Sequence, residues 1–223
     1  MNIDFHAHIL PGADHGSRNM ETSLKQLAMA KEAGMDIIVA TPHFYPEKEN
    51  ISDFLERRTA CARKLREAAQ GKNFPKVLVG CEAQLCRGME HIPDLKRLCI
   101  EGTNVLLLEL PMDYSVRHYS QTLDALFYGS GLRIVLAHID RYDPTHIDFL
   151  LDSGALAQIN AEALCHFWSR RRCLAWVRSG AVVALGSDIH GVNIGYSEFL
   201  KAKKHLKEKY EPLMKRTEAL LPE

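Results

Sequence analysis

The chain has 223 residues, of which 46% are hydrophobic and 25% charged, the composition of a soluble globular protein with room for one large core. Its 28 basic and 28 acidic residues give zero formal net charge without a long block of either sign, which argues against binding to nucleic acid or a membrane surface. No apolar run approaches the roughly 20 residues that span a bilayer, and no secretory pattern is present, so we expect a cytoplasmic protein without membrane insertion.

Short apolar runs alternate with longer amphipathic segments along the whole chain, which predicts an α/β domain with parallel strands. Most of these runs are continuously apolar, as in strands that are buried on both faces. Because no internal repeat or linker interrupts the alternation, we expect one domain over residues 1–223. The predicted strands are Asn2–His6, Asp36–Thr41, Lys76–Cys81, Asn104–Leu110, Arg133–His138, Ala155–Asn160 and Ala181–Ser187.

Helical segments are predicted between the strands from apolar spacing and from capping residues. The predicted helices are a segment from about Met20 that ends at Gly34, residues 53–70, residues 116–128, a helix from Asp143-Pro144 to Gly154, and a tail over 196–221 that packs outside the sheet. Seven strands, each followed by a helix, can close into a barrel or form an open, doubly wound sheet. The pattern alone does not choose between them.

Two other sets of residues have simple structural explanations. The six cysteines form no close CxxC pair, so we expect free thiols rather than a zinc site. The basic run Arg170-Arg171-Arg172 is expected to form a solvated surface.

Ligand-type side chains recur where the predicted strands end. Six of the seven strands lead into a histidine, an aspartate or a glutamate, whereas the sixth ends in the neutral residues Gln158 and Asn160. In a parallel barrel these ends form one rim. The residues are His6 and His8, His43, Glu82, Glu109, His138, and Asp188 with His190.

Imidazole and carboxylate groups are good ligands for zinc, manganese and iron, and a carboxylate can bridge two cations. Alternation along the first strand places His6 and His8 on one face, with Asp4 able to support them from behind. A single HxH, or one acidic residue at a strand end, is weak evidence, since helix caps and turns use the same residues. The repetition at successive strand ends favours a metal site.

Together, these motifs resemble the PHP (polymerase and histidinol phosphatase) family. They are most similar to the manganese-dependent tyrosine-protein phosphatases of bacterial capsule and exopolysaccharide gene clusters, from the first residues to about His190. The motifs that carry the resemblance are HAHILPGADHGS, TPH, GCE, LLLE, AHIDRY and GSDIH.

The resemblance implies a distorted seven-stranded (β/α) barrel of TIM-like PHP type that holds three Mn²⁺ ions at its rim, although iron or zinc would also suit the ligands. The implied ligand groups are His6, His8, Asp188 and a bridging Glu82 for the first ion, Glu82, Glu109 and His138 for the second, and Asp14, His43 and His190 for the third.

The resemblance also assigns phosphate binding to Arg141, whose planar guanidinium suits a phosphoryl group. His15 is a candidate for proton transfer or for an outer contact, at a position that is commonly acidic in the family. Phe44, Tyr45 and Tyr142 are candidates to flank an aryl substrate. One departure is that the segment GVNIGYSEFLK after His190 lacks the second arginine that is typical of these phosphatases.

The predicted function is phosphomonoester hydrolysis, in which hydroxide held between the cations attacks phosphorus. The expected substrate is a phosphotyrosine protein, such as a bacterial tyrosine kinase. One alternative is a small phosphate ester such as histidinol phosphate, a sugar phosphate or a nucleotide. Another is a metal-binding regulatory protein without turnover. The sequence is also compatible with a homo-oligomer.

Overall fold

The computed structural model describes residues 1–112, 116–192 and 195–222. Its strands all pair in parallel, as predicted for an α/β domain. In the described part of the chain they are β1 (Ile3–His8), β2 (Ile37–Ala40), β3 (His43–Phe44), β4 (Lys76–Val79), β5 (Glu82–Gln84), β6 (Val105–Glu109), β7 (Arg133–Leu136), β8 (Leu156–Asn160), β9 (Val182–Gly186) and β10 (Ile189–His190).

The strands form two sheets, with the orders β10-β1-β2-β4 and β3-β5-β6-β7-β8-β9. The expected count of seven strands is wrong because three rim segments form separate short strands, β3, β5 and β10. Pro42, which has no N–H to donate to a ladder, separates β2 from β3, and Asp188, with φ of 51°, separates β9 from β10. No ladder among the described residues closes the two sheets into a barrel.

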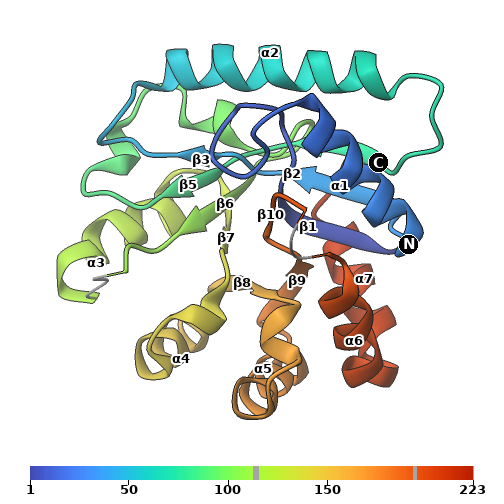
Figure 1. Ribbon diagram of the computed structural model, residues 1–223. Coiled ribbons are helices and arrows are strands. Elements are labelled where there is room, and N and C mark those ends of the chain that lie inside the picture. The colour runs from blue at the N-terminus through green and yellow to red at the C-terminus, as the bar shows by residue number, and fades with distance from the viewer. Residues whose placement is uncertain (113–115, 193–194, 223) are drawn as a thin grey trace.

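The helices surround the strands, with α2 along one side and α3 to α7 around the others (Figure 1). The α-helices are α1 (Met20–Glu32), α2 (Ile51–Ala69), α3 (Val116–Asp124), α4 (Pro144–Asp152), α5 (Phe167–Ser179), α6 (Ser197–Leu206) and α7 (Tyr210–Glu218). Short helical turns are Met89–His91, Leu95–Leu98, a π turn at Ala125–Gly129, Ile139–Arg141, Glu162–Leu164 and Lys207–Lys209.

Helix boundaries follow the predicted caps in several places. The Asp143 side chain accepts a hydrogen bond from the N–H of Thr145 and caps α4, as predicted. The predicted tail helix divides into α6 and α7 at Lys207, because Pro212 is tolerated only in the first turn of a new helix. Helix α5, which contains the arginine run, was not predicted, because its apolar residues follow no clear helical period.

Strand β1 shows how the core and the polar rim share one element. All six of its residues are buried. The pleat places Ile3, Phe5 and Ala7 on one face and the polar side chains of Asp4, His6 and His8 on the other. The sheet therefore buries polar groups that need partners inside the protein.

The tail packs outside the strands, as predicted. The buried hydroxyl of Thr217 on α7 donates to the carbonyl of Val183 in β9 at 2.8 Å. All six cysteines are free thiols, as expected. None of the helices in the described ranges is long and apolar enough to cross a membrane.

Candidate metal centre

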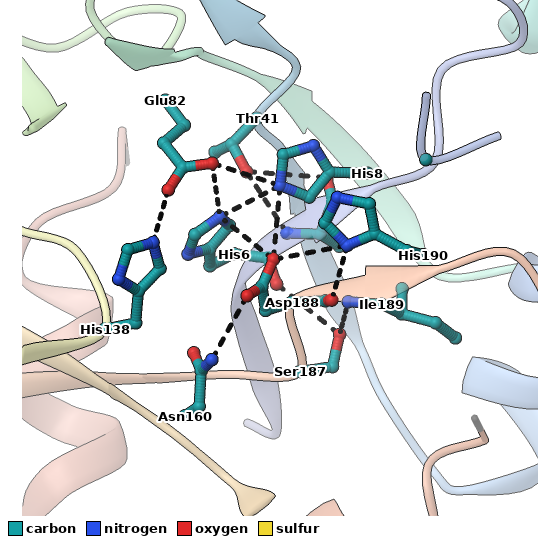
Figure 2. Close-up of polar contacts among 12 residues, drawn as sticks. His6, His8, Thr41, Glu82, His138, Asn160, Ser187, Asp188, Ile189 and His190 are labelled. Carbon is teal, nitrogen blue, oxygen red and sulfur yellow. Dashed lines mark hydrogen bonds and ion pairs between the residues drawn. The ribbon is translucent and has the colours of Figure 1, made fainter. Parts of the chain in front are cut away.

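The structure brings the predicted ligand residues together at one end of the strands (Figure 2). Strand β1 supplies two histidines, β3, β5, β6 and β10 each supply one residue, and the turns after β7 and β9 supply the others. Most of the group is almost completely buried, which is costly for polar groups without strong partners. The members on or beside these strands are His6, His8, His43, Glu82, Glu109, His138, Asp188 and His190.

Four ligand atoms at the centre of this group are closely spaced. The Nε2 atoms of His6 and His8 lie 3.1 Å apart, and each lies 3.2 Å from Oε2 of Glu82. Oδ1 of Asp188 lies 3.6 Å from the first nitrogen and 3.3 Å from the second. Ligand atoms about 2.0–2.1 Å from a tetrahedral cation lie roughly 3.3–3.4 Å from one another. These residues therefore fit around one divalent ion.

Two further groups of ligand atoms adjoin the first. One combines His43, Glu82 and Glu109, and the other combines His8, His43 and His190, with all ligand atoms of a group within 4.8 Å of one another. Two buried ligand atoms have neither a hydrogen bond nor an ion pair with any described residue, as expected of atoms that bind cations. These are Oε2 of Glu109 and Nε2 of His190.

The groups differ in part from those that the family resemblance implies. Asp14 does not join the third group, because its carboxylate lies 2.7 Å from Nδ1 of His8 and accepts the N–H groups of Gly16 and His43. His138 lies beside the second group, with Nε2 2.6 Å from Oε1 of Glu82 and 3.7 Å from Oε1 of Glu109. In this arrangement Asp14 orients His8.

The protonation states suit cation binding. Burial opposes charge on Glu82 and Asp188, but the neighbouring histidines hold the pKa of both carboxyls well below the usual range. Burial, assisted by His8, lowers the pKa of His190 to about 4, so its ring is neutral at pH 7. Burial lowers the pKa of His8, but Asp14 and the other carboxylates outweigh it and raise the value well above normal. His8 must therefore release a proton when it binds a cation.

Two residues that the sequence did not assign to the site orient its ligands. Oε1 of Gln158 lies 3.2 Å from Nδ1 of His6 and accepts the backbone N–H of His138 at 2.7 Å. Asn160 donates to Oδ2 of Asp188 at 3.1 Å. Their signal was present, because the two residues lie on the same face of β8 at its rim end. They were not predicted as site residues because their side chains are neutral, whereas the predicted ligands are histidines and carboxylates.

Asp4 contacts one of the β1 histidines and also the turn after β9. Its Oδ1 accepts the backbone N–H of His6 at 3.3 Å. The carboxylate also accepts hydrogen bonds from the backbone N–H and hydroxyl of Ser187, at 2.8 and 2.6 Å, and from the hydroxyl of Tyr196 at 2.8 Å. These bonds fix the turn that carries Asp188.

Replacing Gly186 with alanine is expected to displace His6. A Cβ atom at position 186 would lie 2.6 Å from Cβ of His6 and 2.7 Å from Nε2 of Gln158, closer than atoms can approach. We expect the free energy of unfolding to fall by about 1–3 kcal/mol and the affinity for metal to fall with it. Thermal unfolding with and without added metal measures both. The control is Gly129→Ala, which should have little effect, because a Cβ atom added at position 129 has no atom within 4 Å. Gly154 is also in open space but has positive φ, so alanine there would strain the backbone.

Three predicted residues lie at the outer edge of the cluster. Arg141, with 46% of its side chain exposed, donates to Oδ2 of Asp188 at 2.5 Å. His15 is exposed, and its ring lies 4.9 Å from that of His43 and 4.8 Å from that of His190. Tyr45 stacks on His43 at 5.2 Å. Each can contact a molecule that approaches the metal ligands.

Two predicted substrate contacts do not lie at this edge. Phe44 is 1% exposed and packs on Phe54 with ring centroids 5.0 Å apart, so the expected substrate contact is wrong. Alternation in β3 turns His43 towards the ligands and Phe44 towards α2. Tyr142 is buried, its hydroxyl donates to the carbonyl of Leu110, and its ring lies 5.8 Å from that of His138. It supports a ligand residue instead of facing an open site.

The fold and this site define a class of protein, a parallel α/β domain with a buried cluster of histidines and carboxylates suited to divalent cations. The chain belongs to the CpsB/CapC family of capsular polysaccharide synthesis, whose family model matches residues 2–220. The resemblance inferred from the sequence motifs is thereby confirmed.

Relatives and solved structures agree with this assignment. The chain is 27% identical over 206 residues to tyrosine-protein phosphatase YwqE of Bacillus subtilis, covering 85% of this chain and 78% of the relative. It is 26% identical over 202 residues to putative tyrosine-protein phosphatase CapC of Staphylococcus aureus, covering 85% and 77%. One chain from the crystal structures of YwqE from B. subtilis and CpsB from Streptococcus pneumoniae, described as unique metal-dependent tyrosine phosphatases, matches with a TM-score of 0.79 and 25% identity, covering 98% of this chain and 94% of that one.

A more distant likeness concerns the fold alone. Histidinol phosphate phosphatase from Lactococcus lactis matches with a TM-score of 0.62 at 14% identity, covering 94% of each chain.

Proposed function

We propose that this protein is a metal-dependent phosphomonoester hydrolase that acts on phosphotyrosine in proteins, a bacterial tyrosine kinase being one such substrate. The observation that carries the proposal is the set of four ligand atoms from His6, His8, Glu82 and Asp188, spaced 3.1–3.6 Å apart. The family supplies the substrate class, because its relatives bear the name tyrosine-protein phosphatase. The proposal places the activity in a single domain over residues 1–223, which one contiguous hydrophobic core supports.

We propose manganese as the native metal, with three ions held by the nine predicted ligands. In this proposal Asp14 exchanges its contact with His8 for the third ion. Divalent cations at this position supply an activated water at neutral pH and neutralise phosphoryl oxygens. The ligand groups share residues, which supports more than one ion. His8 and His43 each belong to two groups, and Glu82 belongs to one group and lies 3.2 Å from His8 of another.

The residues at the edge bind and orient the substrate in this proposal. The exposed N–H groups of Arg141 donate to the phosphoryl oxygens and stabilise charge there in the transition state. Tyr45 flanks the substrate ring. His15 lies between solvent and the ligands, where it can transfer a proton. A phenol has a pKa near 10, so a phenolate leaving group depends less on protonation than an alkoxide does.

A second candidate substrate is a small phosphate ester that carries a positive charge. A cavity of about 150 Å³ beside the ligands is lined by Arg141, Asp188 and His190 and also by Glu162 and Glu198. The two glutamates would attract an amine and repel an acidic peptide. The expected second phosphate-binding arginine does not occur at positions 191–215. Lys201, 3.8 Å from Glu198, offsets part of the negative charge there.

A substrate panel distinguishes these candidates. Manganese-loaded protein is assayed for kcat/KM on a phosphotyrosine peptide, the matching phosphoserine peptide and histidinol phosphate, with the metal content measured in parallel. We expect at least about a tenfold preference for phosphotyrosine over phosphoserine. Higher kcat/KM on histidinol phosphate than on either peptide would favour the second candidate. Bound metal with no hydrolysis of any ester would contradict both and favour a regulatory role.

A further inference from the structure

A second cavity, separate from the candidate metal centre, lies on the outer side of the domain. It has a volume of about 680 Å³, and among the described residues it shares no lining residue with the metal ligands. One wall is α2, from Ser52 to Arg63, and the other is the segment from Lys96 to Thr103 that precedes β6. Small-molecule sites occupy roughly 300–1,000 Å³, so the cavity is large enough for an organic ligand.

Basic side chains dominate the lining of this cavity. Arg58, Arg63, Lys96 and Arg97 line it, against Glu56 and Glu101. Glu101 is already engaged, because it accepts a hydrogen bond from Arg66 at 2.6 Å and another from the N–H of Val79 at 3.1 Å. The cavity therefore has an excess of positive charge.

The basic groups are weakly paired. Arg63 lies 3.3 Å from Glu67 and Arg97 lies 3.5 Å from Asp94, and all four side chains are exposed. Exposed ion pairs of this kind contribute about 0–1 kcal/mol, so a ligand can replace them readily. Lys96 has no ion pair with any residue that the structure describes.

Arg58 is the most enclosed of the four basic groups. Its guanidinium donates to the carbonyls of Gly80 and Arg97, at 3.2 and 2.9 Å, and forms no ion pair within the described ranges. Burial lowers its pKa from the ordinary value. The guanidinium also lies 5.6 Å from the centroid of the Phe54 ring. A partly desolvated cation without an ion-pair partner is stabilised by a nearby anion.

The cavity also has an apolar part. Leu55, Cys99 and Ile100, each at most 5% exposed, lie between the basic side chains. A ligand with an apolar or aromatic ring as well as negative charge would contact both parts, whereas inorganic phosphate would use only the basic side chains.

We propose that this cavity binds a ring-bearing phosphate compound of the size of a nucleoside diphosphate. The phosphates contact Arg63, Lys96 and Arg97, and the ring lies over Leu55 and Ile100. Binding at this site requires no turnover, so the proposal stands or falls separately from the proposed hydrolase activity.

The cavity also adjoins the backbone that leads to one of the metal ligands. Arg58 holds the carbonyl of Gly80, which precedes Glu82 by two residues. Ile100 contacts Gly80 so closely that an added Cβ at position 80 would lie 3.0 Å from its Cγ1. A ligand that engages Arg58 or Ile100 therefore binds next to the backbone that precedes Glu82.

The test measures the affinity of ADP for the full, manganese-loaded chain by titration calorimetry. The manganese concentration is equal in the protein and ADP solutions. We expect Arg63→Glu/Lys96→Glu to weaken ADP binding by at least about tenfold, because it replaces two attractive charges with repulsive ones. Arg141→Ala, in the candidate metal centre, should leave the affinity within about twofold. Inorganic phosphate should bind at least about tenfold more weakly than ADP, because it lacks the ring.

The location of the ADP site is tested independently by hydrogen–deuterium exchange. Bound ADP should slow the exchange of the backbone amides of residues 96–103. The neutral variant Arg63→Gln/Lys96→Gln should show a smaller loss of affinity, and it replaces the charge-reversal variant if that variant fails to fold. The proposal is overturned if ADP does not bind, if its affinity is unchanged in both cavity variants, or if Arg141→Ala abolishes binding.

Discussion

Replacing His8 with alanine is expected to remove bound metal and to lower kcat/KM for phosphate esters by about a thousandfold or more. His8 belongs to two of the three ligand groups, and its Nε2 lies within 3.3 Å of Glu82 and Asp188. Its loss therefore disturbs more than one cation. Elemental analysis of the purified variant and single-substrate kinetics with added manganese measure the two effects.

A matched control is His91→Ala. His91 is a histidine outside the cluster with 83% of its side chain exposed, so this variant should retain both metal and activity. The assigned role of His8 would be excluded by a His8→Ala protein that keeps its full metal content and turns over at the normal rate. The thermal stability of both variants without metal shows whether the fold persists.

The ligand residues could be predicted because their pattern depends on strand direction alone. Parallel strands end at one edge, so His43, Glu82 and Asp188 could be placed together although they are far apart in sequence. In the structure His43 lies 3.0 Å from Glu82, and His8 lies 3.2 Å from Glu82 and 3.3 Å from Asp188, in agreement with that reasoning.

The division of the site among individual ions depends on details that sequence spacing does not contain. Asp14 follows a turn, and the direction of its carboxylate depends on the hydrogen bonds from Gly16 and His43. The same holds for Gln158 on β8, whose carbonyl oxygen contacts both His6 on β1 and His138 after β7. Residue type indicates what these side chains can bind, and packing decides which neighbour they reach.

Aromatic residues were the least predictable part of the site. Phe44 and Tyr45 are adjacent to His43, yet one is buried against α2 and the other stacks on the histidine ring. Predicting this requires knowing that β3 starts at His43, which in turn depends on the break at Pro42. The division into two sheets was missed for the same reason, because short strands of two or three residues have no periodic pattern.

Replacing Arg141 with alanine is expected to lower kcat/KM by about 10²–10³-fold while the metal content stays unchanged. The guanidinium is partly exposed beside the ligands, and among the described ligand residues it bonds to Asp188 alone. Asp188 keeps its bond from Asn160 and its contacts with His6 and His8 after the substitution. The variant therefore removes a phosphate donor and leaves the cation ligands in place.

Arg141→Lys separates charge from geometry. Lysine keeps the positive charge but cannot donate two parallel hydrogen bonds to a phosphoryl group, so we expect it to recover only part of the lost rate. Full recovery would mean that the charge alone matters at this position. Loss of metal from Arg141→Ala would mean that the arginine acts by holding Asp188 in place, and its assignment to phosphate binding would then fail.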